Sequence, residues 1–167
     1  MRKILPIIIM MFCTFISCSK DDDIEQPQIN ATVKEIWASL NGSYKATYYF
    51  NNIEKEWYSE TIDFHPYSEP KKITPKVILF PSFTAYGTAT ITDTRVSDIK
   101  GSSTCYYSIE VAYNGAAPTI SFFEYGENGE VRNKEDKRNI KNWDYTQFDM
   151  WNYGLSEKEN IKTYYKQ

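Results

Sequence analysis

The chain has 167 residues, of which 41% are hydrophobic, 16% aromatic and 25% charged, and its formal net charge is -3. This length fits one domain, or one domain with processing segments, and is short for two full cores. The charge balance argues against a disordered acidic tail and against a nucleic-acid-binding protein. The 14 Tyr, 9 Phe and 4 Trp predict strands that carry bulky side chains.

The N-terminus has the pattern of a secretory signal peptide over residues 1–17. Arg2 and Lys3 precede an apolar run that begins at Ile4 and continues to Ile16, and small residues end the segment. The run is shorter than the roughly 20 residues that a membrane-spanning helix needs. A buried N-terminal helix would need polar residues on one face, and the segment has none. We therefore expect a leader that is removed.

The residues after the apolar run resemble the lipid-attachment site of exported bacterial lipoproteins. The segment 15–18, Phe-Ile-Ser-Cys, resembles a lipobox, in which Cys18 is lipidated after cleavage just before it. The next residues resemble the acidic surface-export tag of Bacteroidota-type lipoproteins, and they are Ser19, Lys20, Asp21, Asp22 and Asp23. The resemblance implies a lipid-anchored protein of the outer membrane that is exposed at the cell surface. Without it, the aspartates are a solvated charge run and Cys18 is an ordinary thiol.

The mature chain is expected to form one domain without a disulfide. Residues 18–28 are polar and acidic, which is typical of a flexible tether, and the domain then covers residues 29–167. With Cys18 used by lipid, Cys105 has no intramolecular partner, so the fold depends on its core. Apolar residues at helical spacing predict a short helix over 29–40, capped by Thr32 and ended by Asn41-Gly42.

After Gly42 the apolar period becomes two, which predicts eight or nine antiparallel strands. The expected strands cover residues 43–50, 56–64, 77–80, 83–92, 105–113, 119–125, 130–132, 143–151 and 161–165. Residues 65–75 are predicted to be a loop because they contain three prolines, and residues 134–141 because of their dense mixed charge. Turns are expected at 98–103 and at Asn128-Gly129. Short connections favour an all-β, up-and-down antiparallel barrel after one short helix, with a β-sandwich as the alternative.

The helix leading into the first strand resembles the opening of the lipocalin-like family. The motif is Leu-Asn-Gly-Ser-Tyr over residues 40–44, with Tyr44 where that family usually has Trp. The resemblance spans residues 31–166. It implies a small eight-stranded barrel whose interior binds a small apolar or amphipathic ligand.

The residues do not form a recognisable catalytic constellation, so we expect no enzyme activity, no cofactor and no metal. The single histidine, His65, is flanked by proline and has no nucleophile motif near it. Cysteine and histidine are too few for a metal cluster of that kind. Cys105 begins an apolar row, which predicts a buried and unreactive thiol. Paired carboxylates leave glycoside hydrolysis open, although solvent-facing side chains explain them more simply, and they are Glu56, Glu60, Asp63, Glu110 and Glu124.

Aromatic side chains are the remaining candidates for binding. The residues expected to line a ligand cavity are Tyr48, Tyr107, Tyr113, Phe123 and Tyr125. Core filling and cross-strand aromatic pairs explain the same residues without a ligand. A second hypothesis is a glycan- or protein-binding accessory module of the cell surface that uses exposed aromatics. The two differ in whether Tyr107 and Tyr113 line a void or whether Trp143, Tyr145 and Trp151 form an exposed patch.

Overall fold

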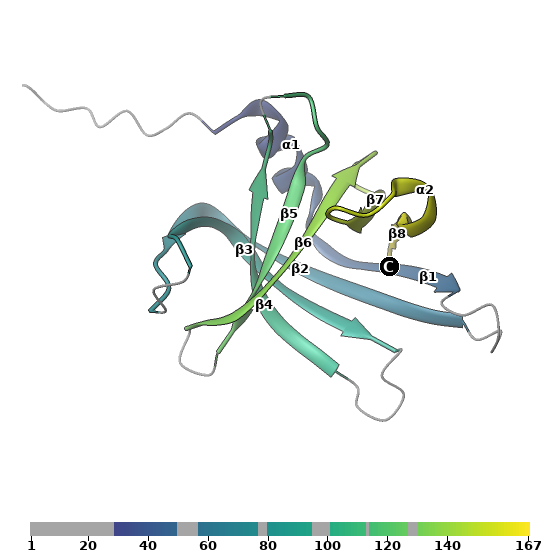
Figure 1. Cartoon of the computed structure of the whole chain (residues 1–167), viewed down its shortest axis with the longest axis horizontal. Coiled ribbons are helices and arrows are strands. Elements are labelled where there is room, and N and C mark those ends of the chain that lie inside the picture. The colour runs from purple at the N-terminus through teal and green to yellow at the C-terminus, as the bar shows by residue number, and fades with distance from the viewer. Residues whose placement is uncertain (1–28, 50–56, 77–79, 95–100, 113, 127–129) are drawn as a thin grey trace, which may run out of the picture.

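The computed structural model describes residues 29–49, 57–76, 80–94, 101–112, 114–126 and 130–167. Among these residues, eight antiparallel strands form a closed barrel in which each strand pairs with its neighbours in chain order (Figure 1). The strands are β1 (Gly42–Tyr49), β2 (Trp57–Ile73), β3 (Phe83–Asp93), β4 (Gly101–Glu110), β5 (Thr119–Tyr125), β6 (Val131–Lys141), β7 (Gln147–Asn152) and β8 (Lys162–Lys166). The up-and-down barrel is confirmed, and the sandwich alternative is wrong.

Helix α1 (Ala31–Ser39) precedes β1 and lies over one end of the barrel (Figure 1). Its N-cap is Asn30 and not Thr32, because the Asn30 side chain accepts a hydrogen bond of 2.9 Å from the backbone N–H of Thr32. The apolar face of the helix is buried in the barrel core. The Tyr44 hydroxyl donates to the Ser39 carbonyl at 2.7 Å, which ties the end of α1 to β1.

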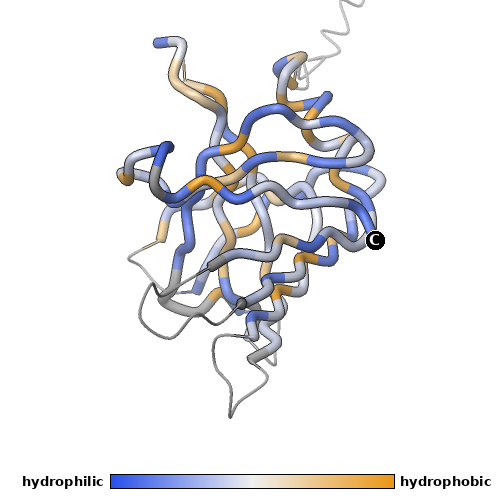
Figure 2. The backbone as a smooth tube through the Cα atoms, turned by 90° about the vertical axis from the view of Figure 1, so that its right-hand side faces the viewer, coloured by the Kyte–Doolittle hydropathy of each residue, from blue (hydrophilic) through white to orange (hydrophobic). Residues whose placement is uncertain are grey.

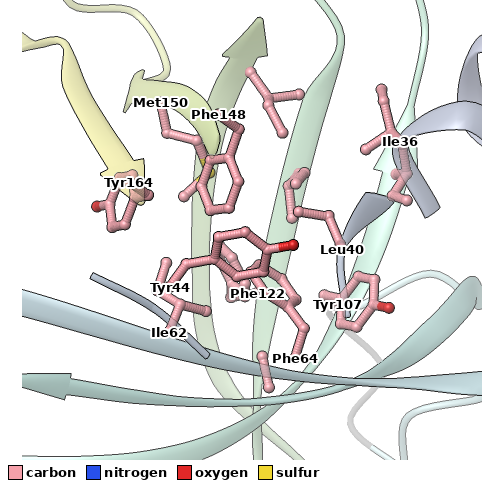
Figure 3. Packing of buried hydrophobic residues seen from close by; sticks show 14 of the residues in the cluster. Ile36, Leu40, Tyr44, Ile62, Phe64, Tyr107, Phe122, Phe148, Met150 and Tyr164 are labelled. Carbon is pink, nitrogen blue, oxygen red and sulfur yellow. The ribbon is translucent and has the colours of Figure 1, made fainter. Parts of the chain in front are cut away.

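The main core extends from α1 into the barrel and consists largely of inward-facing aromatic rings (Figure 3). The ring of Phe64 lies 5.2 Å from that of Tyr107, and Phe148 stacks on Tyr164 at 5.0 Å. Along the strands, hydrophobic and hydrophilic residues are interspersed (Figure 2), as expected for a barrel wall with one apolar face. Among the described residues, ten aromatic side chains are buried, and Cys105 is a free cysteine, so this part of the fold depends on its apolar core.

Residues 65–73 belong to β2, so the predicted loop is wrong over this segment. The last pair between β1 and β2 is Gly42 with Phe64, and beyond it β2 pairs with β3 alone. Pro66 therefore sits where one side of the strand has no partner in the barrel ladder, a position that tolerates proline. The pairing register of β2 with β3 shifts between Pro66 and Lys71, so the residues between these two are accommodated as an irregularity in the strand.

Residues 134–141 also lie in a strand, β6, and not in the predicted loop. Their mixed charge alternates across the barrel wall, so that Lys137 and Lys141 stay partly exposed while Arg138 and Ile140 are buried. The charge of Arg138 is accommodated inside by acidic partners, described below. The loop prediction failed because it rested on the mixed charge of residues 134–141 alone. The segment is a strand, and its inner face takes part in a buried ion pair.

The remaining boundaries differ by a few residues. Gly101–Ser103 open β4, so the predicted turn there is too long, and that strand ends at Glu110. β7 begins at Gln147, because residues 143–146 form a turn in which the Asp144 carboxylate accepts backbone bonds from the next residues. A short helix, α2 (Glu157–Asn160), precedes β8 and was not predicted. The expected strand over 77–80 and the turn at Asn128-Gly129 fall largely outside the described residues.

Outside the barrel, the far ends of β2 and β3 fold back and form a second apolar cluster with β4, β5 and β6. β3 approaches β2 closely at Gly87, where a Cβ atom would lie 2.4 Å from the His65 carbonyl oxygen and 2.8 Å from the Pro66 Cα. In this cluster Phe83 stacks on Phe123 with ring centroids 3.9 Å apart. None of the helices in the described ranges is both long enough and apolar enough to cross a bilayer.

Candidate functional site at the barrel mouth

The inner wall changes from apolar to polar at the end of the barrel away from α1. The strand register places a layer of polar side chains there, and its members are Tyr48, Tyr58, Glu60, Asp93, Ser103, Glu124, Asp136, Arg138 and Lys162. A cavity of about 180 Å³ opens beside this layer, lined by Glu60, Ile91, Asp93, Ser103, Cys105, Phe122, Glu124, Asp136 and Arg138. We call this cavity the barrel mouth.

A buried ion-pair network forms the floor of the mouth. The Arg138 guanidinium donates from Nη1 to Glu60 Oε1 at 2.6 Å and from Nη2 to Glu60 Oε2 at 3.2 Å. It also donates to the Asp136 carboxylate at 2.9 and 2.5 Å, and the Tyr164 hydroxyl donates to Glu60 Oε1. The side chains of Glu60 and Arg138 are 2% and 9% exposed, so both charges are held in a nearly dry environment.

The network sets the ionisation of its members. Burial by itself raises the pKa of Glu60, but the charge and hydrogen bonds of Arg138, with Lys162 and Tyr164, hold that pKa below its usual range. Burial lowers the pKa of Arg138, yet Glu60 and Asp136 keep it well above the ordinary value. Burial and the neighbouring Glu60 charge both raise the pKa of Tyr164. The floor of the mouth is therefore an ionised pair with a neutral phenol beside it.

Aromatic and charged groups meet at the rim of the mouth. The Tyr48 hydroxyl donates to the Asp93 carboxylate at 3.2 Å, and the Lys162 ammonium lies 3.9 Å from the centroid of the Tyr48 ring. The rings of Tyr48 and Tyr58 are 6.4 Å apart. The aromatic rim therefore accommodates one ammonium group, that of Lys162.

The electrostatics of the mouth favour a positive partner. Among the described residues, its lining contains four carboxylates and one guanidinium. The guanidinium of Arg138 is occupied by Glu60 and Asp136, and Lys162 lies against Tyr48. A concave site with an acidic surplus and low-dielectric walls concentrates cations.

Neither Cys105 nor His65 supplies a reactive group to the mouth. Cys105 is 2% exposed, its thiol donates to the Ala89 carbonyl at 3.3 Å, and burial raises the pKa of the thiol to about 12. The prediction of a buried, unreactive thiol is confirmed. His65 lies on the surface, 3.4 Å from Asp63, and is 60% exposed. Within the described ranges, His, Cys, Asp and Glu side chains do not gather in threes that could hold a metal ion.

The structure describes the side chains of three of the five predicted binding residues, and these three do not line one cavity. Tyr48 lies at the rim of the mouth, whereas Tyr107 is fully buried in the core. Phe123 belongs to the second cluster outside the barrel. Tyr113 and the side chain of Tyr125 fall outside the described residues. Of the three predicted residues whose side chains are described, Tyr48 lies at the mouth.

The expected exposed aromatic patch is not formed by the three residues named for it. Tyr145 is 66% exposed, but Trp151 is 8% exposed and Trp143 packs partly buried against the core. Glu60 and Glu124, two of the carboxylates named from the sequence, both line the mouth, whereas Asp136 and Arg138 were not predicted as site residues. One signal could have placed Glu60 on the inner face, because it shares the period-two face of Ile62 and Phe64.

The chain was compared with protein families, curated proteins and solved structures, and it matches none of them. Its function must therefore be argued from its own geometry.

Proposed function

We propose that the protein is a lipid-anchored binding protein whose barrel mouth takes a small amphipathic ligand with a cationic head group. An eight-stranded barrel fits a lipocalin-like ligand-binding fold, in which an interior open at one end receives a small molecule. The observation that carries the proposal is the mouth itself, where carboxylates surround a cavity next to aromatic and aliphatic side chains.

The size and lining of the mouth limit the part of the ligand that enters it. A cavity of about 180 Å³ has the volume of roughly six waters, which suits a head group rather than a whole lipid. Phe122 and Ile91 supply apolar wall, while Glu124 and Asp93 supply negative charge beside it. An ammonium carrying methyl groups satisfies both, because its charge is attracted to the carboxylates and its methyl groups pack on aromatic faces.

The proposed location rests on the N-terminal motifs. Cys18 is the lipidation site in this proposal, and the tag from Ser19 to Asp23 directs the protein to the outside of the outer membrane. Several acyl chains would hold the protein firmly, since each buried CH₂ contributes about 0.8 kcal/mol. Cys18→Ala is expected to move the protein from the membrane to the soluble fraction and to abolish labelling by a fatty-acid analogue. Unchanged membrane recovery and unchanged labelling would refute the anchor.

The binding proposal is tested by calorimetry on the Cys18→Ala protein with two ligands of equal tail length. Octyltrimethylammonium is expected to bind, and octanoate is not. Glu124→Gln should weaken binding of the ammonium by about tenfold, because it removes one of the carboxylates that attract the positive charge. Glu35→Gln is the matched control, because Glu35 is exposed on α1, at the other end of the barrel from the mouth. Equal binding of octanoate, or equal losses in the two variants, would contradict the proposal.

A further inference from the structure

A second cavity lies on the outer surface of the barrel and is separate from the mouth. It has a volume of about 290 Å³ and lies between residues 80–84 and the outer faces of β4, β5 and β6. We call it the outer groove. Ser108, which lines it, belongs to the face of β4 opposite to that of Cys105. The groove therefore does not share a chamber with the proposed head-group site.

The floor of the outer groove contains a buried hydroxyl without a partner. Ser108 is 4% exposed, and its Oγ makes no hydrogen bond with any of the described residues. Buried hydroxyls in native proteins are nearly always hydrogen-bonded, because an unsatisfied one is costly. A polar group of a bound molecule in the groove would satisfy Ser108 Oγ, and the orphaned hydroxyl is the observation that points to a ligand here.

Flat aromatic surface stands next to this hydroxyl. Phe83 and Phe123, which both line the groove, stack with their rings inclined by only 15°. Phe83 and Phe80 are partly buried, so this wall keeps some exposed ring surface. A planar ring placed against it gains apolar burial and an offset-stacked contact.

The charges around the groove determine which sign of ligand charge is favoured. Of the described residues that line it, Glu110 and Glu135 are ionisable carboxylates, and none is Lys or Arg. Glu110 accepts from Lys137 at 2.8 Å, and Glu135 accepts from Ser121 at 2.8 Å. A carboxylate offers about four acceptor sites, so each retains capacity for a further donor. A cation is favoured over an anion.

We propose that the outer groove binds a planar aromatic cation, whose ring packs on Phe83 and Phe123 and whose donor groups reach Ser108 Oγ and the two glutamates. This proposal does not rest on the proposed function, since it uses a different face of the barrel wall.

The test uses para-aminobenzamidine as the planar cation and para-aminobenzoate as the anion of matching ring size. Binding is followed by calorimetry on the Cys18→Ala protein. The amidine is expected to bind and the benzoate is not. Ser108→Ala should weaken amidine binding by about tenfold, as expected when one hydrogen bond to a charged donor is lost. Phe123→Leu should weaken it through the lost ring contact. Glu124→Gln, in the mouth, should leave it unchanged.

A stability measurement separates a binding role of Ser108 from a structural one. Because Ser108→Ala removes an unsatisfied buried hydroxyl, its denaturation midpoint should equal or exceed that of the parent protein. The proposal predicts unchanged or higher stability together with weaker amidine binding. Amidine binding that Ser108→Ala leaves unchanged, that Glu124→Gln abolishes, or that para-aminobenzoate equals would overturn it.

Discussion

The buried pair of Arg138 and Glu60 makes the sharpest stability prediction. In the Arg138→Met variant, a side chain of similar length replaces the guanidinium, while Glu60 stays in its nearly dry position with Tyr164 as a hydrogen-bond donor. The variant therefore removes the positive charge and leaves a buried carboxylate without its main partner.

The expected loss follows from the burial of both side chains. Breaking a buried ion pair by removing one partner costs about 3–5 kcal/mol, and Glu60 and Arg138 are only 2% and 9% exposed. Removing both charges restores much of that loss, because no uncompensated charge remains. Glu60→Gln keeps an acceptor for the Tyr164 hydroxyl, so the double variant with Arg138→Met should regain at least about 1 kcal/mol as coupling free energy.

The loss should also depend on pH, with a sign that the network fixes. In the parent protein the pKa of Glu60 is lowered, so its contribution to stability is present above the unfolded pKa and is lost as pH falls through the folded one. Without Arg138, burial dominates and raises that pKa, so the folded variant binds the proton more tightly than the unfolded chain. The stability gap between parent and variant should therefore be largest near pH 7 and should narrow toward pH 4.

Urea denaturation at pH 7 and at about pH 4.5 measures both effects, with equal m-values as the check on two-state unfolding. Glu110→Gln is the matched control, since its ion pair is exposed and contributes little. A loss below about 1 kcal/mol, or a gap that does not change with pH, would refute the view that Glu60 and Arg138 form a buried ionised pair.

Three further predictions follow from the fold. Gly87→Ala should lower stability by about 1–3 kcal/mol in urea denaturation, because the new Cβ meets the backbone of His65 and Pro66; an unchanged midpoint would contradict the close approach of β2 and β3. Tyr44→Phe should cost about 0.5–1.5 kcal/mol, because it removes one hydrogen bond while the Ser39 carbonyl keeps the Asn41 backbone N–H as a second donor; a neutral effect would show that α1 does not depend on the bond to Tyr44. In a protein carrying Cys13→Ala and Cys18→Ala, so that Cys105 is its single thiol, Cys105 should react with a thiol reagent at pH 8 only after urea unfolding, since the pKa of the thiol is about 12; rapid labelling of the folded protein would be inconsistent with its burial.

The period-two pattern was sufficient to predict most of the strands and the residues that face the core. The row of Tyr44 and Ala46, and that of Cys105, Tyr107 and Ile109, are buried as the alternation predicts. Closure of the barrel could not be predicted from either row. It depends on pairing between β1 and β8, which are the first and last strands in the sequence. The loop predicted over residues 65–75 failed because a proline is excluded only from a strand paired on both sides.

The candidate site was harder to predict because it is made of charges. Solitary charged residues in strands usually face solvent, so Glu60 and Arg138 offered no reason to be paired across 78 residues of sequence. Only the folded barrel brings them to the same layer. Phe123 was expected to line the interior of the barrel. Its neighbour Phe122 faces the interior instead, and Phe123 lines the outer groove. A shift of one residue along a strand exchanges the two faces.

The proposed binding at the mouth is tested most directly by amide chemical-shift mapping during titration with octyltrimethylammonium. The largest shifts are expected in the amides of Ile91, Glu124 and Asp136, which line the mouth from strands β3, β5 and β6. The same shifts should be absent in a titration with octanoate and reduced in Glu124→Gln. Shifts confined to residues outside the mouth, or no shifts at millimolar ligand, would contradict the proposal that the mouth is a binding site for a cationic head group.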